Sequence, residues 1–233
     1  MLQIRPANTR GRAEHGWLSS RHTFSFGHYH DPRHMGFGPL RVINEDRVQP
    51  GQGFGTHAHR DMEILSYVVE GALEHKDSMG NGSVLRYGDV QRMSAGSGVT
   101  HSEFNHSASE PVHFLQIWVM PERAGIDPGY EEKHFAPDSK RGQLRLIAAP
   151  QGEDGAVRIH QDARIYASIL DGDARLDYPL AAGRGAYVQV VRGTLSVNGQ
   201  TLQAGDALQA IDEASLQFAD AKDSEFLLFD LPR

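Results

Sequence analysis

A repeated strand–glycine–strand pattern constrains the fold of this chain more than any other feature of its sequence. The segment 67–73 (YVVEGAL) is echoed by 189–195 (QVVRGTL), and 85–90 (LRYGDV) is echoed by 202–207 (LQAGDA). Two echoes in the same order indicate two copies of one structural unit. The glycines are offset by 193 − 71 = 122 and 205 − 88 = 117 residues, so the first copy has 122 − 117 = 5 extra residues between them. We expect these residues to lengthen a hairpin turn at the glycine-rich stretch 77–82.

The rest of the chain shows the same pattern of short strands. Runs of branched and aromatic residues, such as those within 38–43 and 112–119, alternate with glycine-containing turns and show no long helical periodicity. This pattern is typical of an all-β sandwich or barrel with little helix. We therefore expect two similar β-barrels packed together, with residues 1–135 in the first domain and 150–233 in the second. The polar, proline- and glycine-containing stretch 137–155 is the expected linker region.

Composition excludes several classes of function. The chain has 233 residues, 39% of them hydrophobic, so it can bury a substantial core, but it has no apolar run near the roughly 20 residues that a membrane span needs. Its N-terminus lacks the apolar stretch of a secretory signal, so a cytoplasmic location is expected. The net charge of −7, with no dense basic run, disfavours direct binding to nucleic acid. Because cysteine is absent, any metal must be bound by nitrogen and oxygen.

Two pairs of candidate ligands stand out among the 13 histidines. His57 and His59 are separated by one residue, as are His101 and Glu103. On a strand, residues i and i+2 point to the same face, so each pair can present two side chains to one point in space. Two such pairs on facing strands predict a site of three nitrogens and one carboxylate for a divalent transition metal, with positions left open for substrate or oxygen. Glu63 could supply the carboxylate instead, because the alternation of side chains along a strand does not decide between Glu63 and Glu103.

The surroundings of these residues resemble the cupin motifs. Gly51, His57, His59 and Glu63 follow the spacing of the first motif, although the closing Gly71 comes one residue late. The second motif is looser, since Ser94 replaces its proline and the histidine comes two residues late. These departures fit one subfamily, the pirins, which the chain resembles in the segments 22–26 (HTFSF), 36–42 (GFGPLRV), 55–63 (GTHAHRDME), 93–98 (MSAGSG) and 101–103 (HSE). The resemblance covers most of residues 1–125 and continues more weakly through the second copy.

The resemblance implies an all-β bicupin, that is, two double-stranded β-helix (jelly-roll) barrels, of which the N-terminal one (1–135) binds metal and the C-terminal one (150–233) does not. In pirins the matching side chains bind a single metal, iron in the best-known case. Here that implies His57, His59, His101 and Glu103, with Glu63 in a supporting role. Fe(II) is the expected ion, and Zn, Ni, Cu, Mn and Co are alternatives.

Bacterial pirins are implicated as quercetin 2,3-dioxygenases, which open the central ring of a flavonol with O2 and release carbon monoxide. On this reading the substrate is a small flavonol-like aromatic, and Glu103 is the catalytic base that takes its hydroxyl proton. The alternative implied by the resemblance is a metal-binding co-regulator that acts through protein–protein interaction. We expect a monomer with no membrane or direct nucleic-acid partner, and a protein partner only on the second reading.

Other features are expected to be structural. His28 and His30 form a second H-x-H pair, but they precede a turn sequence and have no cupin glycine framework, so exposed or hydrogen-bonded histidines are expected there. Adding the repeat offsets to the four predicted ligands gives Pro179, Ala181, Phe218 and Asp220, so the second copy should lack a metal site. An apolar cavity beside the metal is predicted to draw on some of Phe24, Phe26, Met35, Phe37, Met62, Met93 and Trp118.

Overall fold

Strands make up 63% of the protein and helices 4% in the computed structural model, which describes residues 1–233. The predicted all-β class is confirmed. The chain divides into an N-terminal unit, Gly11–His134 with Val157–Gln161, and a C-terminal unit, Met1–Arg10 with Phe135–Ala156 and Asp162–Arg233. No helix is long and apolar enough to cross a membrane.

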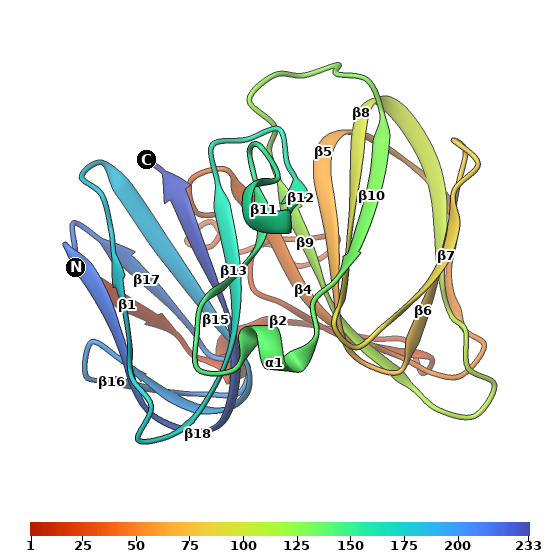
Figure 1. The fold of residues 1–233 in the computed structure, drawn as a ribbon. Coiled ribbons are helices and arrows are strands. Elements are labelled where there is room, and N and C mark those ends of the chain that lie inside the picture. Colours follow the sequence, from red (N-terminus) through yellow and green to blue (C-terminus); the bar gives the residue numbers. More distant parts are fainter. The chain divides into compact units, whose positions relative to one another are not determined.

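The N-terminal unit is one sheet with the strand order β2-β3-β4-β9-β5-β8-β6-β7, in which β10 also pairs with β8 (Figure 1). The strands of this unit are β2 (Gly11–Glu14), β3 (Leu18–His22), β4 (Leu40–Val48), β5 (Gly53–Glu70), β6 (Ala72–Asp77), β7 (Gly82–Arg86), β8 (Asp89–Asn105), β9 (Val112–Val119), β10 (Gly129–His134) and β12 (Val157–Arg158). Strands β5 and β8 are the long central strands of this sheet. They carry all four predicted metal ligands.

The C-terminal unit has the strand order β1-β17-β15-β18-β13-β11, with β14 paired to β18 and β16 paired to β15. Its strands are β1 (Leu2–Arg5), β11 (Arg145–Ala149), β13 (Arg164–Gly172), β14 (Leu176–Pro179), β15 (Arg184–Val197), β16 (Gln200–Gln203), β17 (Ala207–Ile211) and β18 (Ser215–Pro232). Its helices are short: α1 (Pro137–Lys140) and the 3-10 turns η1 (Ala7–Thr9) and η2 (Glu153–Gly155). Both termini lie in this unit (Figure 1).

The first residues of the chain belong to the C-terminal unit because β1 is an edge strand of its sheet. β1 pairs antiparallel with β17, from Leu2 opposite Ala210 to Arg5 opposite Ala207. The segment Val157–Gln161 in turn belongs to the N-terminal unit. The expected domain ranges 1–135 and 150–233 stay a prediction, and the two structural units differ from them at Met1–Arg10 and Val157–Gln161.

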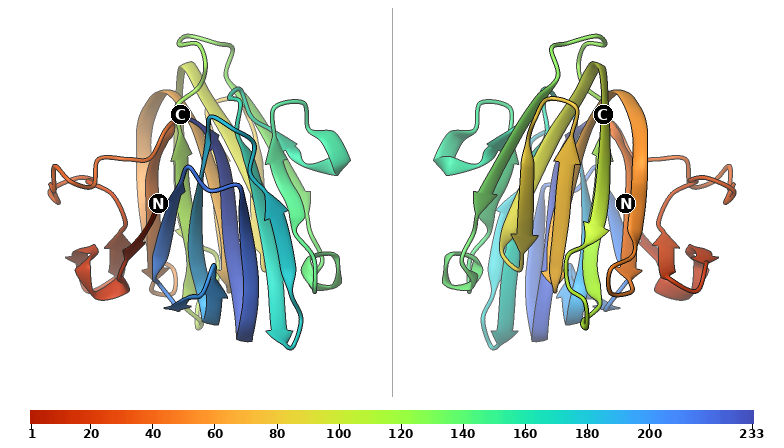
Figure 2. Two further views of the ribbon diagram at one scale, coloured as in Figure 1. Left: turned by 90° about the vertical axis from the view of Figure 1, so that its left-hand side faces the viewer. Right: turned by 90° about the vertical axis from the view of Figure 1, so that its right-hand side faces the viewer.

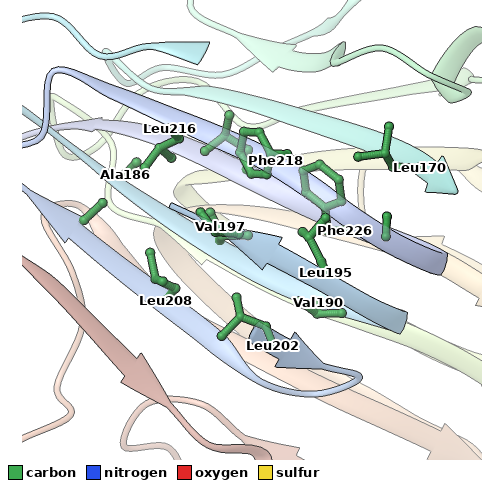
Figure 3. Close-up of a cluster of buried hydrophobic side chains, with 14 of the residues drawn as sticks. Leu170, Ala186, Val190, Leu195, Val197, Leu202, Leu208, Leu216, Phe218 and Phe226 are labelled. Carbon is green, nitrogen blue, oxygen red and sulfur yellow. The ribbon is translucent and has the colours of Figure 1, made fainter. Parts of the chain in front are cut away.

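Each unit has an apolar core of inward-facing strand residues. In the C-terminal unit, leucine, valine and phenylalanine side chains from β13, β15 and β18 fill the space within the sheet, and the rings of Phe218 and Phe226 stack at 4.8 Å (Figure 3). In the N-terminal unit one cluster includes Val68, Leu73 and Phe114. Such clusters fix the strand register, because a one-residue slip would turn the apolar side chains to the opposite face.

The two glycine-centred hairpins differ as the repeat predicts. In the first, β6 and β7 form five residue pairs from Ala72–Arg86 to Lys76–Gly82 and leave residues 77–81 as the turn. In the second, β15 and β16 form four pairs, and two residues, 198 and 199, make the turn. One additional pair accounts for two residues and the longer turn for three, which gives the five extra residues. The longer hairpin joins the sheet of the N-terminal unit through the pairing of β6 with β8 (Figure 2, right).

Candidate metal centre

The pairing of β5 with β8 places the predicted ligands on adjacent strands. His57 lies directly opposite His101 in this antiparallel pair. The register shifts between Phe54 and His57, where three residues of β5 match two of β8, so a β-bulge precedes His57. It also shifts after His59, where Asp61 has a φ of 68°. The histidine pair thus lies between two irregularities that terminate regular pairing on either side.

The three histidines converge as the strand parity predicts. The ring centroids of His57 and His59 are 4.7 Å apart, those of His57 and His101 are 4.6 Å apart, and those of His59 and His101 are 4.9 Å apart. One ligand nitrogen from each ring lies within 4.8 Å of the others. The Nε2 atoms of His57 and His101 are 3.1 Å apart. Nitrogens bound at right angles to one ion, at metal–nitrogen distances of about 2.1 Å, are separated by about 3 Å, so this spacing fits a shared metal.

The hydrogen bonds of the first two histidines also fit metal ligation. Nδ1 of His57 lies 2.8 Å from the carbonyl oxygen of Gly55, in the bulge, and donates its proton there. This hydrogen bond leaves Nε2 of His57 as the free lone pair, which is the usual arrangement of a metal-binding imidazole. Nε2 of His59 is buried and has no hydrogen-bond partner in the protein. A buried nitrogen of this kind is costly unless something binds it, and a metal ion is such a partner.

Glu103 lies beside the histidines in a shell of donors. Its Oε1 accepts hydrogen bonds from Ser66 Oγ (3.1 Å) and Gln91 Nε2 (3.0 Å), and its Oε2 accepts one from Gln116 Nε2 (2.8 Å). Glu103 forms a second close group of potential ligand atoms with His75 and His101. His101 belongs to both groups, whereas Glu103 is not in the group that contains His57 and His59.

Burial sets the protonation of these groups in the metal-free protein. Desolvation, together with the neighbouring histidines, lowers the pKa of His101 to about 3. Desolvation, together with His57, lowers the pKa of His59 to about 4. Burial, together with the nearby Asp46, raises the pKa of Glu103 to about 7, although the hydrogen bonds from Ser66, Gln116 and Gln91 act to lower it. At neutral pH His59 and His101 are therefore neutral, as metal ligands must be, and Glu103 is poised to exchange a proton.

Glu63, the alternative carboxylate, lies elsewhere. It is opposite Ser94 on β8 and fully buried, and it belongs to neither group of potential ligand atoms. Its Oε2 accepts a hydrogen bond from the backbone N–H of His160 (3.2 Å) and lies 3.4 Å from Nδ1 of the same residue. Glu63 therefore attaches the segment Val157–Gln161 to the N-terminal unit.

A cavity of about 450 Å³ opens beside His57, His59 and Glu103, and its volume is within the usual size range for small-molecule sites. Its aromatic walls are formed by Trp17, Phe26, Phe54 and Trp118. Trp118 meets the ring of His59 edge-on at 5.0 Å and that of Phe26 at 5.4 Å. Polar side chains from β4 and β9 complete the lining: Asn44, Asp46 and Gln116. Oδ1 of Asn44 and Oδ1 of Asp46 make no hydrogen bond within the protein.

Only part of the predicted cavity lining is observed. Phe26 and Trp118 line the cavity, whereas Met35 is 51% exposed at the surface. The other predicted residues pack into apolar core or lie against it: Phe24, Phe37, Met62 and Met93. His28 and His30 are exposed and belong to no group of potential ligands. The positions of the C-terminal unit that correspond to the ligands hold Pro179, Ala181, Phe218 and Asp220, and no group of potential ligands lies there.

Sequence reasoning did not identify several residues of the site. His75 is fully buried beside His101, and Asp77 is its hydrogen-bond partner. The spacing His75-x-Asp77 on a strand was the available signal, because it has the same parity as the two ligand pairs. Asn44, Asp46 and Gln116 gave no comparable signal, since they reach the cavity only through the pairing of β4 and β9.

Comparisons with known proteins agree with this geometry. Residues 3–119 match the family model described as Pirin, and residues 146–231 match the one described as Quercetinase C-terminal cupin domain. A protein of Escherichia coli (strain K12) named quercetin 2,3-dioxygenase is 49% identical over 232 residues, which cover 100% of this chain and 99% of that protein. A pirin-like protein of Caulobacter vibrioides is 38% identical over 231 residues, 99% of each chain.

The structure of the bacterial pirin YhhW from Escherichia coli in complex with nickel(II) has a TM-score of 0.95 to this chain. The two proteins are 48% identical, and the match covers 100% of this chain and 99% of that one. A second structure of YhhW from Escherichia coli has a TM-score of 0.96 at the same identity. Matches of this extent cover both units of the fold.

Proposed function

The chain belongs to the pirin family, and from this premise we propose that it is a metal-dependent dioxygenase that opens the ring of a flavonol such as quercetin with O2. The observation that carries the proposal is the aromatic cavity of about 450 Å³ lined by His57, His59 and Glu103. The similarity to proteins named quercetin 2,3-dioxygenase supports the substrate class.

We propose that one ion is held by His57, His59, His101 and Glu103. Three neutral imidazoles and one carboxylate form a nitrogen- and oxygen-donor shell, which suits first-row divalent ions and gives no strong preference among them. The nickel complex of the related pirin supports a transition metal. Fe(II) is the proposed ion in the cell, and Ni, Zn, Cu, Mn and Co can occupy the same donor set. When bound, a metal such as iron would supply a Lewis acid and a redox centre.

The residues of the protein bind and orient the substrate. Trp118 and Phe26 offer flat apolar surfaces for aromatic rings. Asn44 and Asp46 offer oxygen acceptors that are otherwise unpaired, so they match the hydroxyl groups of a polyhydroxylated ligand. An aromatic molecule without hydroxyl groups would leave these acceptors buried and unsatisfied, which is costly. The lining therefore favours a hydroxylated flat aromatic over a plain hydrocarbon.

Glu103 is the proposed base. Burial raises its pKa to about 7 in the metal-free protein, so the carboxylate can accept a proton near neutral pH when no ion holds it. Its carboxylate takes the proton of the substrate hydroxyl, and Ser66, Gln91 and Gln116 hold the carboxylate in place while it does so. Glu103 would also be one of the residues that hold the ion.

The test is the reaction itself. Protein loaded with iron, and in parallel with nickel, is mixed with quercetin in air, and O2 uptake and carbon monoxide release are measured. The proposal predicts both in equal amounts, together with loss of the flavonol absorbance. A protein that acts only as a metal-binding co-regulator binds the ion but neither consumes O2 nor releases carbon monoxide, and this result would contradict the proposal.

A further inference from the structure

Three polar side chains, Asp77, His75 and the proposed ligand His101, form a row that leads away from the proposed metal centre. Asp77 and His75 lie on β6, opposite His101 and Glu103 of β8. Nε2 of His75 is 3.1 Å from Oδ2 of Asp77, and Nδ1 of His75 is 3.5 Å from Nδ1 of His101. The His75 ring also stacks on Tyr130 at 4.8 Å with an interplanar angle of 20°, and His75 is fully buried. The ring of His75 therefore has little freedom to rotate.

The donors around Asp77 determine where the protons of this row lie. Oδ1 of Asp77 accepts the backbone N–H groups of Met79 (2.9 Å) and Asn81 (3.0 Å), and Oδ2 accepts Nδ2 of Asn81 (2.9 Å). A carboxylate so surrounded only accepts, so Nε2 of His75 must donate to it. A neutral imidazole has one N–H, which leaves Nδ1 of His75 as an acceptor facing His101.

The donor-to-acceptor direction of these hydrogen bonds also determines the protonation of His101, the proposed metal ligand. Because Nδ1 of His75 accepts, Nδ1 of His101 must carry the proton, and Nε2 of His101 is left as a lone pair on the side where His57 lies, 3.1 Å away. His57 is held in the same tautomer by a different partner, the carbonyl oxygen of Gly55. Metal-binding histidines generally donate their other N–H to such a partner, which fixes the ring and raises its basicity.

We propose that Asp77 and His75 are positioning residues that hold His101 in the tautomer with a free Nε2, so that the metal centre is preformed before an ion arrives. The inference rests on the proposed metal centre. His75 itself lies on the Nδ1 side of the His101 ring, and both of its nitrogens are engaged, so it acts through His101 and not as a ligand.

This role also accounts for the longer hairpin of the first repeat. The turn of residues 77–81 wraps around the Asp77 carboxylate and supplies three of the donors that hold it, from Met79 and Asn81. The corresponding hairpin of the C-terminal unit has a two-residue turn and no histidine, in a unit that lacks a group of potential ligands. The additional residues and the proposed metal centre thus occur together.

Asp77→Asn is the most informative variant because it keeps the size of the side chain. Oδ1 faces two backbone N–H groups, so the amide oxygen takes that position and the amide nitrogen takes the position of Oδ2. This nitrogen donates to Nε2 of His75, which moves the His75 proton to Nδ1. His101 must then accept at Nδ1 and carry its proton on Nε2, toward the ion. An asparagine in place of a histidine-orienting aspartate has this consequence in serine proteases. We expect nickel affinity to fall about 10- to 100-fold.

Two substitutions of His75 separate the hydrogen bond from the packing. His75→Phe keeps a ring to stack on Tyr130 but offers no acceptor, so nickel affinity should fall by a similar factor. His75→Gln loses the ring but offers a carbonyl oxygen to Nδ1 of His101, so it should bind nickel more tightly than His75→Phe, although less tightly than the wild type. His106→Phe is the matched control, because His106 also pairs with a glutamate of β6, Glu74 at 2.8 Å, without touching a proposed ligand. Its nickel affinity should equal that of the wild type.

The readouts are nickel titration by calorimetry and the imidazole 15N–1H correlations of the metal-free protein at pH 8. We expect His101 to carry its proton on Nδ1 in the wild type and on Nε2 in Asp77→Asn. A wild-type His101 protonated on Nε2, or an Asp77→Asn variant that binds nickel as tightly as the wild type, would overturn the inference. Failure of the proposed function has a different signature: the wild type would release no carbon monoxide, whereas the tautomer and affinity measurements would be unaffected.

Discussion

Replacement of Glu103 and Glu63 by glutamine separates the two carboxylates that the sequence offers as metal ligand. Glu103→Gln keeps the shape of the side chain and removes its negative charge and its basicity. One of its oxygens becomes an NH2 group that faces donors, because Oε1 and Oε2 are surrounded by Ser66, Gln91 and Gln116. Glu63→Gln alters only the contacts with His160 and leaves the shell around the three histidines as it is.

The two variants should therefore differ in magnitude. A side chain that only orients a ligand is worth about 10- to 100-fold in metal affinity, so loss of the ligand itself should cost about 100-fold or more, close to 3 kcal/mol. Turnover of metal-saturated Glu103→Gln should fall about 10²- to 10⁴-fold, which is the usual contribution of a positioned base. Glu63 contacts no proposed ligand, so Glu63→Gln should change metal affinity less than about 10-fold.

The assay is a metal titration of both variants, followed by O2 uptake with quercetin at saturating metal, so that lost occupancy does not imitate lost chemistry. The same experiment can refute the reasoning. If Glu63→Gln loses the metal while Glu103→Gln keeps both ion and turnover, the carboxylate ligand is that of the first cupin motif and the assignment of Glu103 is wrong.

Three further predictions concern pH, the cavity and the fold. Because burial raises the pKa of Glu103 to about 7, and a metal binds only its deprotonated form, metal affinity should decrease as the pH falls below 7; Glu103→Gln should remove this part of the pH dependence in titrations between pH 5.5 and 8.5. Trp118→Ala removes an aromatic wall and should raise the KM for quercetin about 3- to 10-fold at unchanged metal content, whereas an unchanged KM would exclude Trp118 from the binding surface. Lys140→Ala removes the ammonium group that lies 3.0 Å from the buried Glu225, while the ion pair of Glu225 with Arg192 at 3.6 Å remains, so the free energy of unfolding should fall by about 2 kcal/mol and Tm by about 6 °C. A Tm within about 2 °C of the wild type would contradict this.

The sequence was sufficient to predict the features that depend on local parity. His57 with His59, and His101 with Glu103, share a strand face because the side-chain period of a strand is two. The repeat was sufficient to locate the longer hairpin, since its five extra residues had to lie between two matched glycines. These inferences needed no knowledge of which strands are neighbours.

Features that depend on the choice of neighbouring strand were not predictable in this way. His75 lies beside His101 only because β6 pairs with β8. Asp46 lines the cavity because of the place that β4 takes in the sheet. Met35 looked like a cavity residue by its proximity in sequence, yet it lies exposed at the surface. The pairing of β1 with β17 joins residues about two hundred positions apart, and the alternation in β1 does not indicate which sheet it will join.

The location of the bound ion tests the central claim most directly. Crystals of the protein grown with nickel or iron can be measured at the absorption edge of the metal, so that anomalous scattering locates the ion independently of the protein density. The account predicts one site, with Nε2 of His57, His59 and His101 and a carboxylate oxygen of Glu103 all within about 2.0 to 2.3 Å of the ion. An ion bound instead by His75, or by Glu63 in place of Glu103, would contradict it.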